Sequence, residues 1–274
     1  MIGFFDSGFG GLSILKEVIG VGDKEKSSLV DFDFMYLGDT ARAPYGNHSP
    51  EKIYTYTTEA LDYLFKHGCE LVVLACFTAS ANALRKIQQE WLPVHYPNKR
   101  VLGVLIPTAE EAIKETKNNR VGILGTRATV NSGALSAELL KRSPNLQIFS
   151  QPAPLLVPLI EEGWVKKVET KKILRYYLKP LKDKKIDTLI LACTHYPILI
   201  RDIKALVSSK VKVFHPGWAE KKSLADYLQR HPEITSTLSK TGKRVFLATD
   251  RIDDFNRLGS KFLGAKISAE LVTL

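Results

Sequence analysis

The sequence predicts an α/β fold in which most strands are parallel. Short apolar runs rich in strand-forming residues alternate with amphipathic stretches along most of the 274 residues, and this alternation is typical of such folds. Sequence similarity between two segments of the chain supports this interpretation, because LVVLACFTASANAL at residues 71–84 resembles TLILACTHYPIL at residues 188–199. Each segment is an apolar run that ends in Ala-Cys, which suits two α/β units set against each other.

The expected elements follow one another in the order of that alternation. The first strand, at residues 2–5, leads into a Gly-rich segment that opens a helix at 12–19, and the second strand lies at 32–37. A long amphipathic stretch predicts a helix at 50–67, followed by a strand at 71–75 and a helix at 80–91. The remaining apolar runs predict strands at residues 101–104, 120–124, 147–150, 188–192, 211–214 and 244–248.

Composition and charge exclude several classes of protein. The net charge is +10, but Lys and Arg are scattered and their densest runs are short, which favours a solvated surface over a nucleic-acid site. No apolar run approaches the roughly 18 residues that a membrane span needs, and the N-terminus lacks the basic start of a signal peptide. The three cysteines have no metal-binding spacing, which predicts reduced thiols. We therefore expect a cytoplasmic protein with no membrane or nucleic-acid partner.

Polar residues follow several of the expected strands at the point where each strand ends. In parallel α/β sheets the carboxyl ends of the strands are where ligands bind, so these residues share one edge. They are Asp6 and Ser7, Asp39 and Thr40, Cys76, Gly125 and Thr126, and Cys193. The sequence therefore places both Cys76 and Cys193 at the edge where chemistry is expected.

The segment DSGFGGLSIL at residues 6–15 is a Gly-rich turn that opens a helix. Its backbone N–H groups could bind an anion, but it is not a nucleotide-binding fingerprint, because Ser13 stands where a third glycine is required. A tight strand-to-helix turn without a ligand explains the glycines equally well. Asp6 likewise has two interpretations, a functional carboxylate or a helix cap.

Cys76 and Cys193 are the strongest candidates for chemistry. A free cysteine is often only a small buried apolar residue, and we interpret Cys69 in that way. A thiol between a strand and a helix N-terminus instead feels partial positive charge that favours the thiolate, and Cys193 also has His195 nearby. Inverting a chiral carbon takes one group to remove a proton and another to supply one on the opposite face. Two thiols, with reference pKa values of about 8.5, can do this for the α-proton of a small acidic substrate.

Six ordered segments resemble the glutamate racemases of the aspartate/glutamate racemase superfamily. They are DSGFGGLSIL, YLGDTARAPYG, ACFTASANAL, VGILGTRATVNSG, LLVPLIEEG and LACTHYPIL, with a weaker similarity around FLATDRIDDFNRLGSKFLG. The resemblance implies two pseudo-symmetric α/β domains, each a mainly parallel sheet flanked by helices, with the active site in the cleft between them. It places residues 1–98 and 209–274 in the domain of Cys76, and residues 99–208 in that of Cys193. It also implies no cofactor, a homodimer, and a supply of D-glutamate for peptidoglycan.

The resemblance assigns roles to individual residues. Cys76 and Cys193 are the two bases, one for each enantiomer, and they are assisted by Asp6, His195 and Glu161. The residues that fall where the family binds the amino and carboxylate groups of its substrate are Ser7, Tyr45, Gly46, Thr78, Thr126 and Thr194, and Pro44 shapes the same loop. No metal ligand is implied.

Three positions depart from the family pattern. Phe77 stands where the family has an Asn in contact with the substrate, Ile-Pro-Thr at 106–108 replaces Glu-Pro-Gly, and His-Pro-Gly at 215–217 replaces a late Asp-Ser segment. Losing an amide that pairs with a charged ligand costs about 1–3 kcal/mol if nothing replaces it. Two alternatives to glutamate racemisation therefore remain: racemisation of aspartate or another amino acid, or a binding role without turnover. Restoring the amide with Phe77→Asn is expected to raise glutamate turnover.

Overall fold

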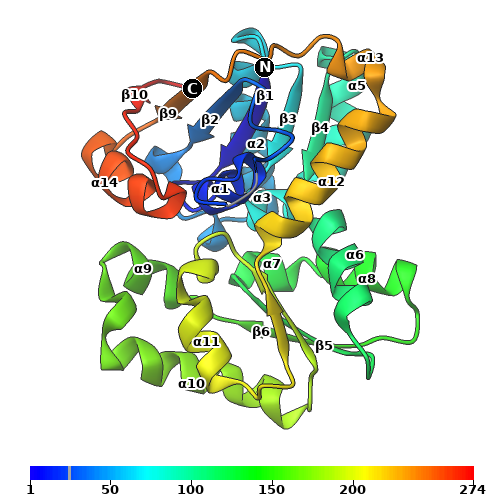
Figure 1. Ribbon diagram of the computed structural model, residues 1–274, viewed down its shortest axis with the longest axis vertical. Coiled ribbons are helices and arrows are strands. Elements are labelled where there is room, and N and C mark those ends of the chain that lie inside the picture. Colours follow the sequence, from blue (N-terminus) through cyan, green and yellow to red (C-terminus); the bar gives the residue numbers. More distant parts are fainter. Residues whose placement is uncertain (24–25) are drawn as a thin grey trace.

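The strands form two parallel sheets, one above the other in the view of Figure 1. This computed structural model describes residues 1–23 and 26–274. The upper sheet has the order β10-β9-β2-β1-β3-β4, and its strands are β1 (Ile2–Asp6), β2 (Phe34–Gly38), β3 (Leu71–Leu74), β4 (Arg100–Gly103), β9 (Arg244–Ala248) and β10 (Glu270–Leu271). The lower sheet has the order β6-β5-β7-β8, with β5 (Arg120–Gly125), β6 (Gln147–Pro152), β7 (Thr188–Ala192) and β8 (Lys212–Phe214). The predicted parallel α/β class is confirmed.

The helices lie between and around these strands. Those of the N-terminal half are α1 (Leu12–Ile19), α2 (Pro50–Lys66), α3 (Phe77–Asn82), α4 (Leu84–Lys86), α5 (Leu92–His95), α6 (Leu105–Glu115), α7 (Arg127–Asn131) and α8 (Ala134–Arg142). The others are α9 (Leu156–Glu161), α10 (Val168–Asp183), α11 (Ile200–Leu206), α12 (Pro216–Arg230), α13 (Pro232–Thr235) and α14 (Ile252–Leu263). Shorter helical turns are η1 (Thr40–Arg42), η2 (Tyr45–Asn47), η3 (Ile87–Trp91), η4 (Trp164–Lys166) and η5 (Tyr196–Leu199).

Most predicted elements lie within a few residues of those observed. The helix predicted at 80–91 instead begins at Phe77, because the Cys76 sulfur caps its first turn by accepting a hydrogen bond from the Ala79 N–H at 3.5 Å. It is also interrupted at Ala83 and continues through the π turn η3. The short strand β10, which has only two residues and is exposed, was not predicted.

The sheet pairings separate the chain into two lobes. The predicted boundaries at residues 98/99 and 208/209 would separate β4 from β3 and β8 from β7, with which they pair. We therefore propose to divide the chain after β4 and after β8. The upper lobe then consists of residues 1–103 and 215–274, and the lower lobe of residues 104–214.

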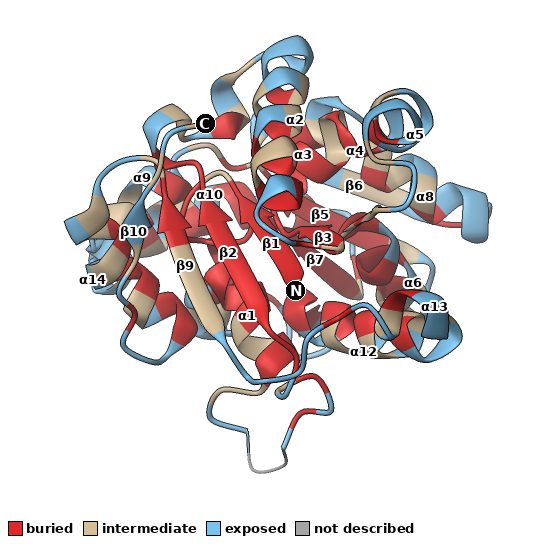
Figure 2. Ribbon diagram, turned by 90° about the horizontal axis from the view of Figure 1, so that it is seen from above, coloured by how far each residue is buried: buried red, intermediate tan, exposed pale blue. Residues whose placement is uncertain are grey.

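Alternate residues of the upper sheet pack on opposite faces. Phe4 and Tyr36 belong to a hydrophobic cluster that α1, α12 and α14 complete, whereas Phe5 and Leu37 belong to a second cluster that α2 completes. The first cluster continues into the lower lobe through the residues of β5 and β7, so one apolar core joins the lobes. Figure 2 shows the buried strands in the centre, with the helices around them.

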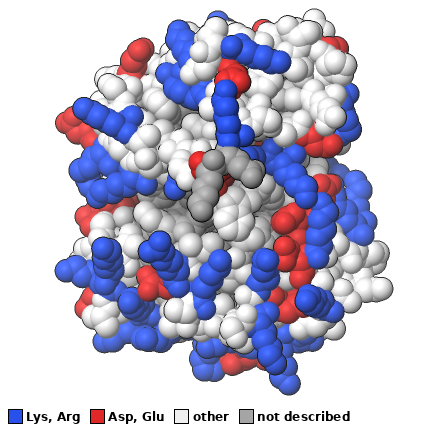
Figure 3. Space-filling model, in the orientation of Figure 1, with Lys and Arg blue, Asp and Glu red and all other residues white. Residues whose placement is uncertain are grey.

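Charged side chains cover much of the surface (Figure 3). Figure 3 shows Lys and Arg over much of this face of both lobes, with acidic residues between them. None of the helices in the described part of the chain is long and apolar enough to cross a membrane.

Candidate active site

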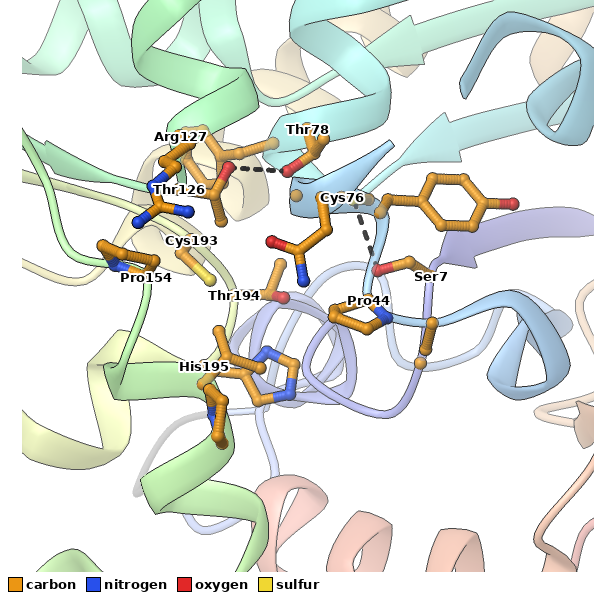
Figure 4. A pocket seen from close by; sticks show the side chains of 18 of the residues that line it. Ser7, Pro44, Cys76, Thr78, Thr126, Arg127, Pro154, Cys193, Thr194 and His195 are labelled. Atoms are coloured by element: carbon orange, nitrogen blue, oxygen red, sulfur yellow. Dashed lines mark hydrogen bonds between the residues drawn. The ribbon is translucent and has the colours of Figure 1, made fainter. Parts of the chain in front are cut away.

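One pocket between the lobes collects almost all of the predicted site residues (Figure 4). The upper lobe contributes Ser7, Gly8, Ala43, Pro44, Tyr45, Gly46, Asn47, Cys76, Phe77 and Thr78 to its lining, and the lower lobe contributes Thr126, Arg127, Pro154, Val157, Pro158, Glu161, Cys193, Thr194 and His195. Cys76 follows β3 and Cys193 follows β7, so each sulfur comes from the carboxyl end of a strand in a different sheet. The pocket therefore combines one thiol from each lobe.

Cys76 is almost completely buried, with 4% of its surface exposed. Its sulfur lies 3.7 Å from the Ser7 hydroxyl and accepts the hydrogen bond from the Ala79 N–H. Burial and the nearby Asp6 carboxylate raise the pKa of the Cys76 thiol to about 12, although the hydrogen bonds from Ala79 and Ser7 oppose this shift. Near neutral pH, Cys76 is therefore a neutral thiol that can donate a proton.

Cys193 has different neighbours from those of Cys76. It is 6% exposed, and His195 and Glu161 lie on its side of the pocket. The His195 Nε2 atom is 3.1 Å from Glu161 Oε1. Burial lowers the pKa of His195, but hydrogen bonding and charge interactions with Cys193 and Glu161 outweigh it and raise that pKa to about 10. A protonated imidazole thus lies beside Cys193, whereas a carboxylate lies near Cys76.

Asp6 is the one predicted site residue that does not line the pocket. It is buried behind the wall, where its Oδ2 atom accepts a hydrogen bond from the Gly8 N–H at 3.0 Å and its Oδ1 atom accepts one from the Thr194 hydroxyl at 3.2 Å. Burial raises the pKa of Asp6, while the charge of His195 and these hydrogen bonds oppose the shift. Asp6 therefore joins the two lobes and acts on the pocket through its neighbours.

The Gly-rich turn supports this junction. Gly11, not Asp6, occupies the N-cap position of α1, and among the described residues no side chain caps the start of that helix. A methyl group on Gly10 would come within 2.4 Å of the Thr194 hydroxyl oxygen, so glycine is required for the lower lobe to approach. The Ser13 hydroxyl also donates to the Thr194 carbonyl at 2.8 Å. These contacts favour close packing as the reason for the glycine at position 10, with no anion needed to explain it.

A second junction lies on the other side of the pocket. The hydroxyl oxygens of Thr78, Thr126 and Thr129 form a triangle with sides of 3.0, 3.2 and 2.9 Å, which links α3 to α7. Thr126 also caps α7 by accepting a hydrogen bond from the Thr129 N–H. Gly46 packs against Thr126, because an added methyl group would lie 2.9 Å from the Thr126 Cβ atom. The pocket is thus held between two sets of contacts across the lobes.

Tyr45 and Phe77 line the pocket but have side chains that are fully or almost fully buried. The Tyr45 hydroxyl donates to Asp39, and its ring lies 6.0 Å from that of Phe5, so its side chain is engaged in packing. Phe77 is 1% exposed and belongs to the apolar cluster that joins the lobes. The position at which the family has an amide is therefore a core position in this chain.

The other two departures from the family pattern lie outside the pocket lining. Residues 106–108 fall in the first turn of α6, where the buried Thr108 hydroxyl has no hydrogen-bond partner in the described part of the chain. His215 caps α12, since its Nδ1 atom accepts a hydrogen bond from the Gly217 N–H at 3.0 Å. His215 thus fills the capping role for which Asp and Ser are usually preferred.

Several lining residues were missed by the sequence reasoning. They are Gly8, Ala43, Asn47, Arg127, Pro154, Val157 and Pro158. Arg127 directly follows Thr126 after a strand end, and that position was the one signal that could have identified it.

Among the described residues, no group of three or more His, Cys, Asp or Glu side chains is arranged to hold a metal ion.

Comparisons with known proteins give a consistent result. Residues 29–222 match the family described as Asp/Glu/hydantoin racemase. A curated glutamate racemase from Geobacter metallireducens is 38% identical over 266 residues, which cover 97% of this chain and 93% of that relative. The solved glutamate racemase RacE1 of Bacillus anthracis superposes with a TM-score of 0.89 at 30% identity, covering 100% of this chain and 97% of that chain. A Francisella tularensis glutamate racemase, solved in complex with D-glutamate, has a TM-score of 0.85 at 31% identity, covering 99% and 97%.

Proposed function

This chain belongs to the Asp/Glu/hydantoin racemase family, and we propose that it interconverts L- and D-glutamate by a two-base mechanism without a cofactor. It is an amino-acid racemase. The observation that carries the proposal is the presence of Cys76 and Cys193 in the lining of one pocket, each at the end of a strand from a different sheet. Two thiols from opposite lobes are suited to act on opposite faces of one substrate carbon.

In this mechanism one sulfur removes the α-proton and the other returns a proton to the opposite face. The thiolate takes the proton from Cα and becomes a thiol, and the electron pair of the broken C–H bond stays on Cα, which becomes a carbanion. The second thiol then gives its proton to that carbon and becomes a thiolate. The reaction inverts the carbon and leaves the two sulfurs with exchanged protonation states, so the reverse reaction uses the same two groups.

The charges around the two sulfurs support unequal resting roles. The pKa of about 12 for Cys76 keeps its sulfur protonated, so Cys76 is the donor in the resting enzyme. His195 lies on the Cys193 side of the pocket, so we assign to Cys193 the role of the base that removes the α-proton. Glu161 holds His195 in place through the 3.1 Å contact with Nε2.

The wider role follows from the same proposal. D-glutamate made by this enzyme would supply peptidoglycan synthesis in the cytoplasm. We propose that the enzyme acts as a homodimer, which size-exclusion chromatography with light scattering can measure directly.

Isotope exchange tests the mechanism. In D₂O the wild-type protein should racemise both enantiomers of glutamate and replace the α-proton with deuterium, as followed by NMR and circular dichroism. Cys76→Ala and Cys193→Ala should each reduce racemisation by about 100-fold or more, because each removes one of two required groups. Any remaining exchange should be confined to one enantiomer, and to opposite enantiomers in the two variants, since a single base reaches one face.

Cys69→Ala is the matched control. Cys69 is a third buried cysteine, but it does not line the pocket, so this variant should racemise like the wild type. Racemisation that survives either Cys76→Ala or Cys193→Ala would contradict the two-base mechanism. Exchange with aspartate but not with glutamate would contradict the substrate, and no exchange with either acid would favour a binding role.

A further inference from the structure

The pocket contains one permanent positive charge that the proposed proton transfers do not use. Among the described residues that line it, Arg127 is the one Lys or Arg side chain. The other cation, the imidazolium of His195, is already paired with Glu161. Arg127 has no hydrogen-bond or ion-pair partner in the part of the chain that the structure describes. A nearby cation, Arg251, lies 2.9 Å from Asp254 and is thus neutralised.

The position of Arg127 is fixed by its neighbours. It is the first residue of α7, directly after Thr126, whose hydroxyl caps that helix and contacts Thr78 of the upper lobe. Its guanidinium is exposed and lies near Pro154 at the edge of the pocket (Figure 4). The backbone at Arg127 is therefore anchored at the lobe junction, while its guanidinium remains available to a ligand.

The chemistry of an acidic amino acid supplies a partner for this guanidinium, an inference that rests on the proposed function. The substrate has one ammonium and two carboxylates, so it enters with a net negative charge that the pocket must compensate. The α-carboxylate has to lie near the two sulfurs, because it is bonded to the reacting carbon. The side-chain carboxylate extends away from them, and a planar guanidinium can bind it with two parallel hydrogen bonds.

We propose that Arg127 is a specificity-determining residue that binds the side-chain carboxylate of the substrate. This carboxylate does not change during racemisation, so the contact is equally strong in the ground state and the transition state. Such uniform binding lowers KM and leaves kcat unchanged. Arg127 thereby selects acidic amino acids over their neutral amides, since glutamine has no charge at the same position.

The test compares Arg127→Met with the wild type. Methionine keeps a long side chain but removes the charge, so the dissociation constant and KM for D-glutamate should rise by about 10- to 100-fold. kcat should change little, and the preference for glutamate over glutamine in kcat/KM should fall by the same factor. Arg127→Lys should recover part of the affinity, because it restores the charge without the planar pair of donors. Calorimetry measures the dissociation constant without requiring turnover.

Arg175→Met is the matched control for the loss of one positive charge. Arg175 is exposed on α10 of the same lobe and does not line the pocket, so this variant should bind D-glutamate like the wild type. Unchanged binding in Arg127→Met, or a fall in kcat at unchanged KM, would overturn the inference. Wild-type protein that binds glutamate without racemising it would contradict the proposed function but not this role, and wild-type protein that does not bind glutamate would contradict both.

Discussion

A methyl group added to Gly10 would lie 2.5 Å from the Nδ1 atom of His195. Gly10 belongs to the turn after β1, and His195 follows β7 in the other lobe, so this close approach sets the distance between the lobes at the pocket. The ring of Phe9 lies 5.4 Å from the His195 ring and packs against the same side chain. The position of the imidazole beside Cys193 therefore depends on the absence of a side chain at Gly10.

Gly10→Ala should displace the Thr194–His195 segment. The new methyl group would overlap the side chains of Thr194 and His195, which costs about 1–3 kcal/mol in a well-packed region. We expect lower unfolding free energy in urea and a loss of racemase activity. Gly8→Ala is the control for stability, because no atom of the described residues outside its chain neighbours lies within 4 Å of the added methyl group. Equal unfolding free energies for the two variants would contradict this prediction, because they would show that the lobes accommodate a methyl group at position 10 without loss of stability.

Thr126→Val should weaken both the cap of α7 and the link to Thr78. The variant keeps the shape of the side chain but removes the hydroxyl that accepts the Thr129 N–H, and losing a cap costs about 0.5–2 kcal/mol. KM for glutamate should also rise, because Arg127 follows this cap. Thr126→Ser retains the hydroxyl and should therefore keep the stability and the KM for glutamate close to those of the wild type. Chemical unfolding and steady-state kinetics test this, and a Thr126→Ser variant as impaired as Thr126→Val would contradict it.

The stability contribution of His195 should depend on pH. Its pKa is about 10 in the folded protein, against an ordinary value of 6.5, so folding favours the protonated form. The contribution is fully present below about pH 6.5 and is lost as the pH rises through about 10. The difference in unfolding free energy between the wild type and His195→Gln should therefore shrink from pH 6 to pH 10. A difference that stays constant over this range would contradict the raised pKa.

Phe77→Asn is expected to raise glutamate turnover but to reduce stability. The amide restores the polar contact that the family pattern has at this position, which should raise turnover. Phe77 is 1% exposed, and replacing a buried Phe by Ala costs about 3–5 kcal/mol of unfolding free energy, so we expect a loss of similar size for Phe77→Asn. Phe77→Leu is the control, since it changes the packing without adding a polar group. Turnover per folded molecule and thermal unfolding distinguish the two effects. If turnover does not rise, the pocket has compensated for the missing amide elsewhere.

The sequence was sufficient to predict the parallel α/β class and the placement of Cys76 and Cys193 at strand ends. Both follow from local patterns, because the alternation of apolar runs with amphipathic stretches identifies strands and helices. The residue after a parallel strand lies at the edge where ligands bind. The family resemblance also predicted most of the other residues that line the pocket.

Only the tertiary structure decided which of these residues meet and in what environment. Asp6 contacts Thr194, which lies 188 residues later in the chain, and no local pattern encodes such a contact. Packing placed Asp6 behind the pocket wall and made position 77 part of the core. It also left Arg127 at the edge of the pocket with no partner among the residues that the structure describes. The unequal charges beside Cys76 and Cys193 have the same origin, since burial and neighbouring groups set a pKa and both depend on how the two lobes come together.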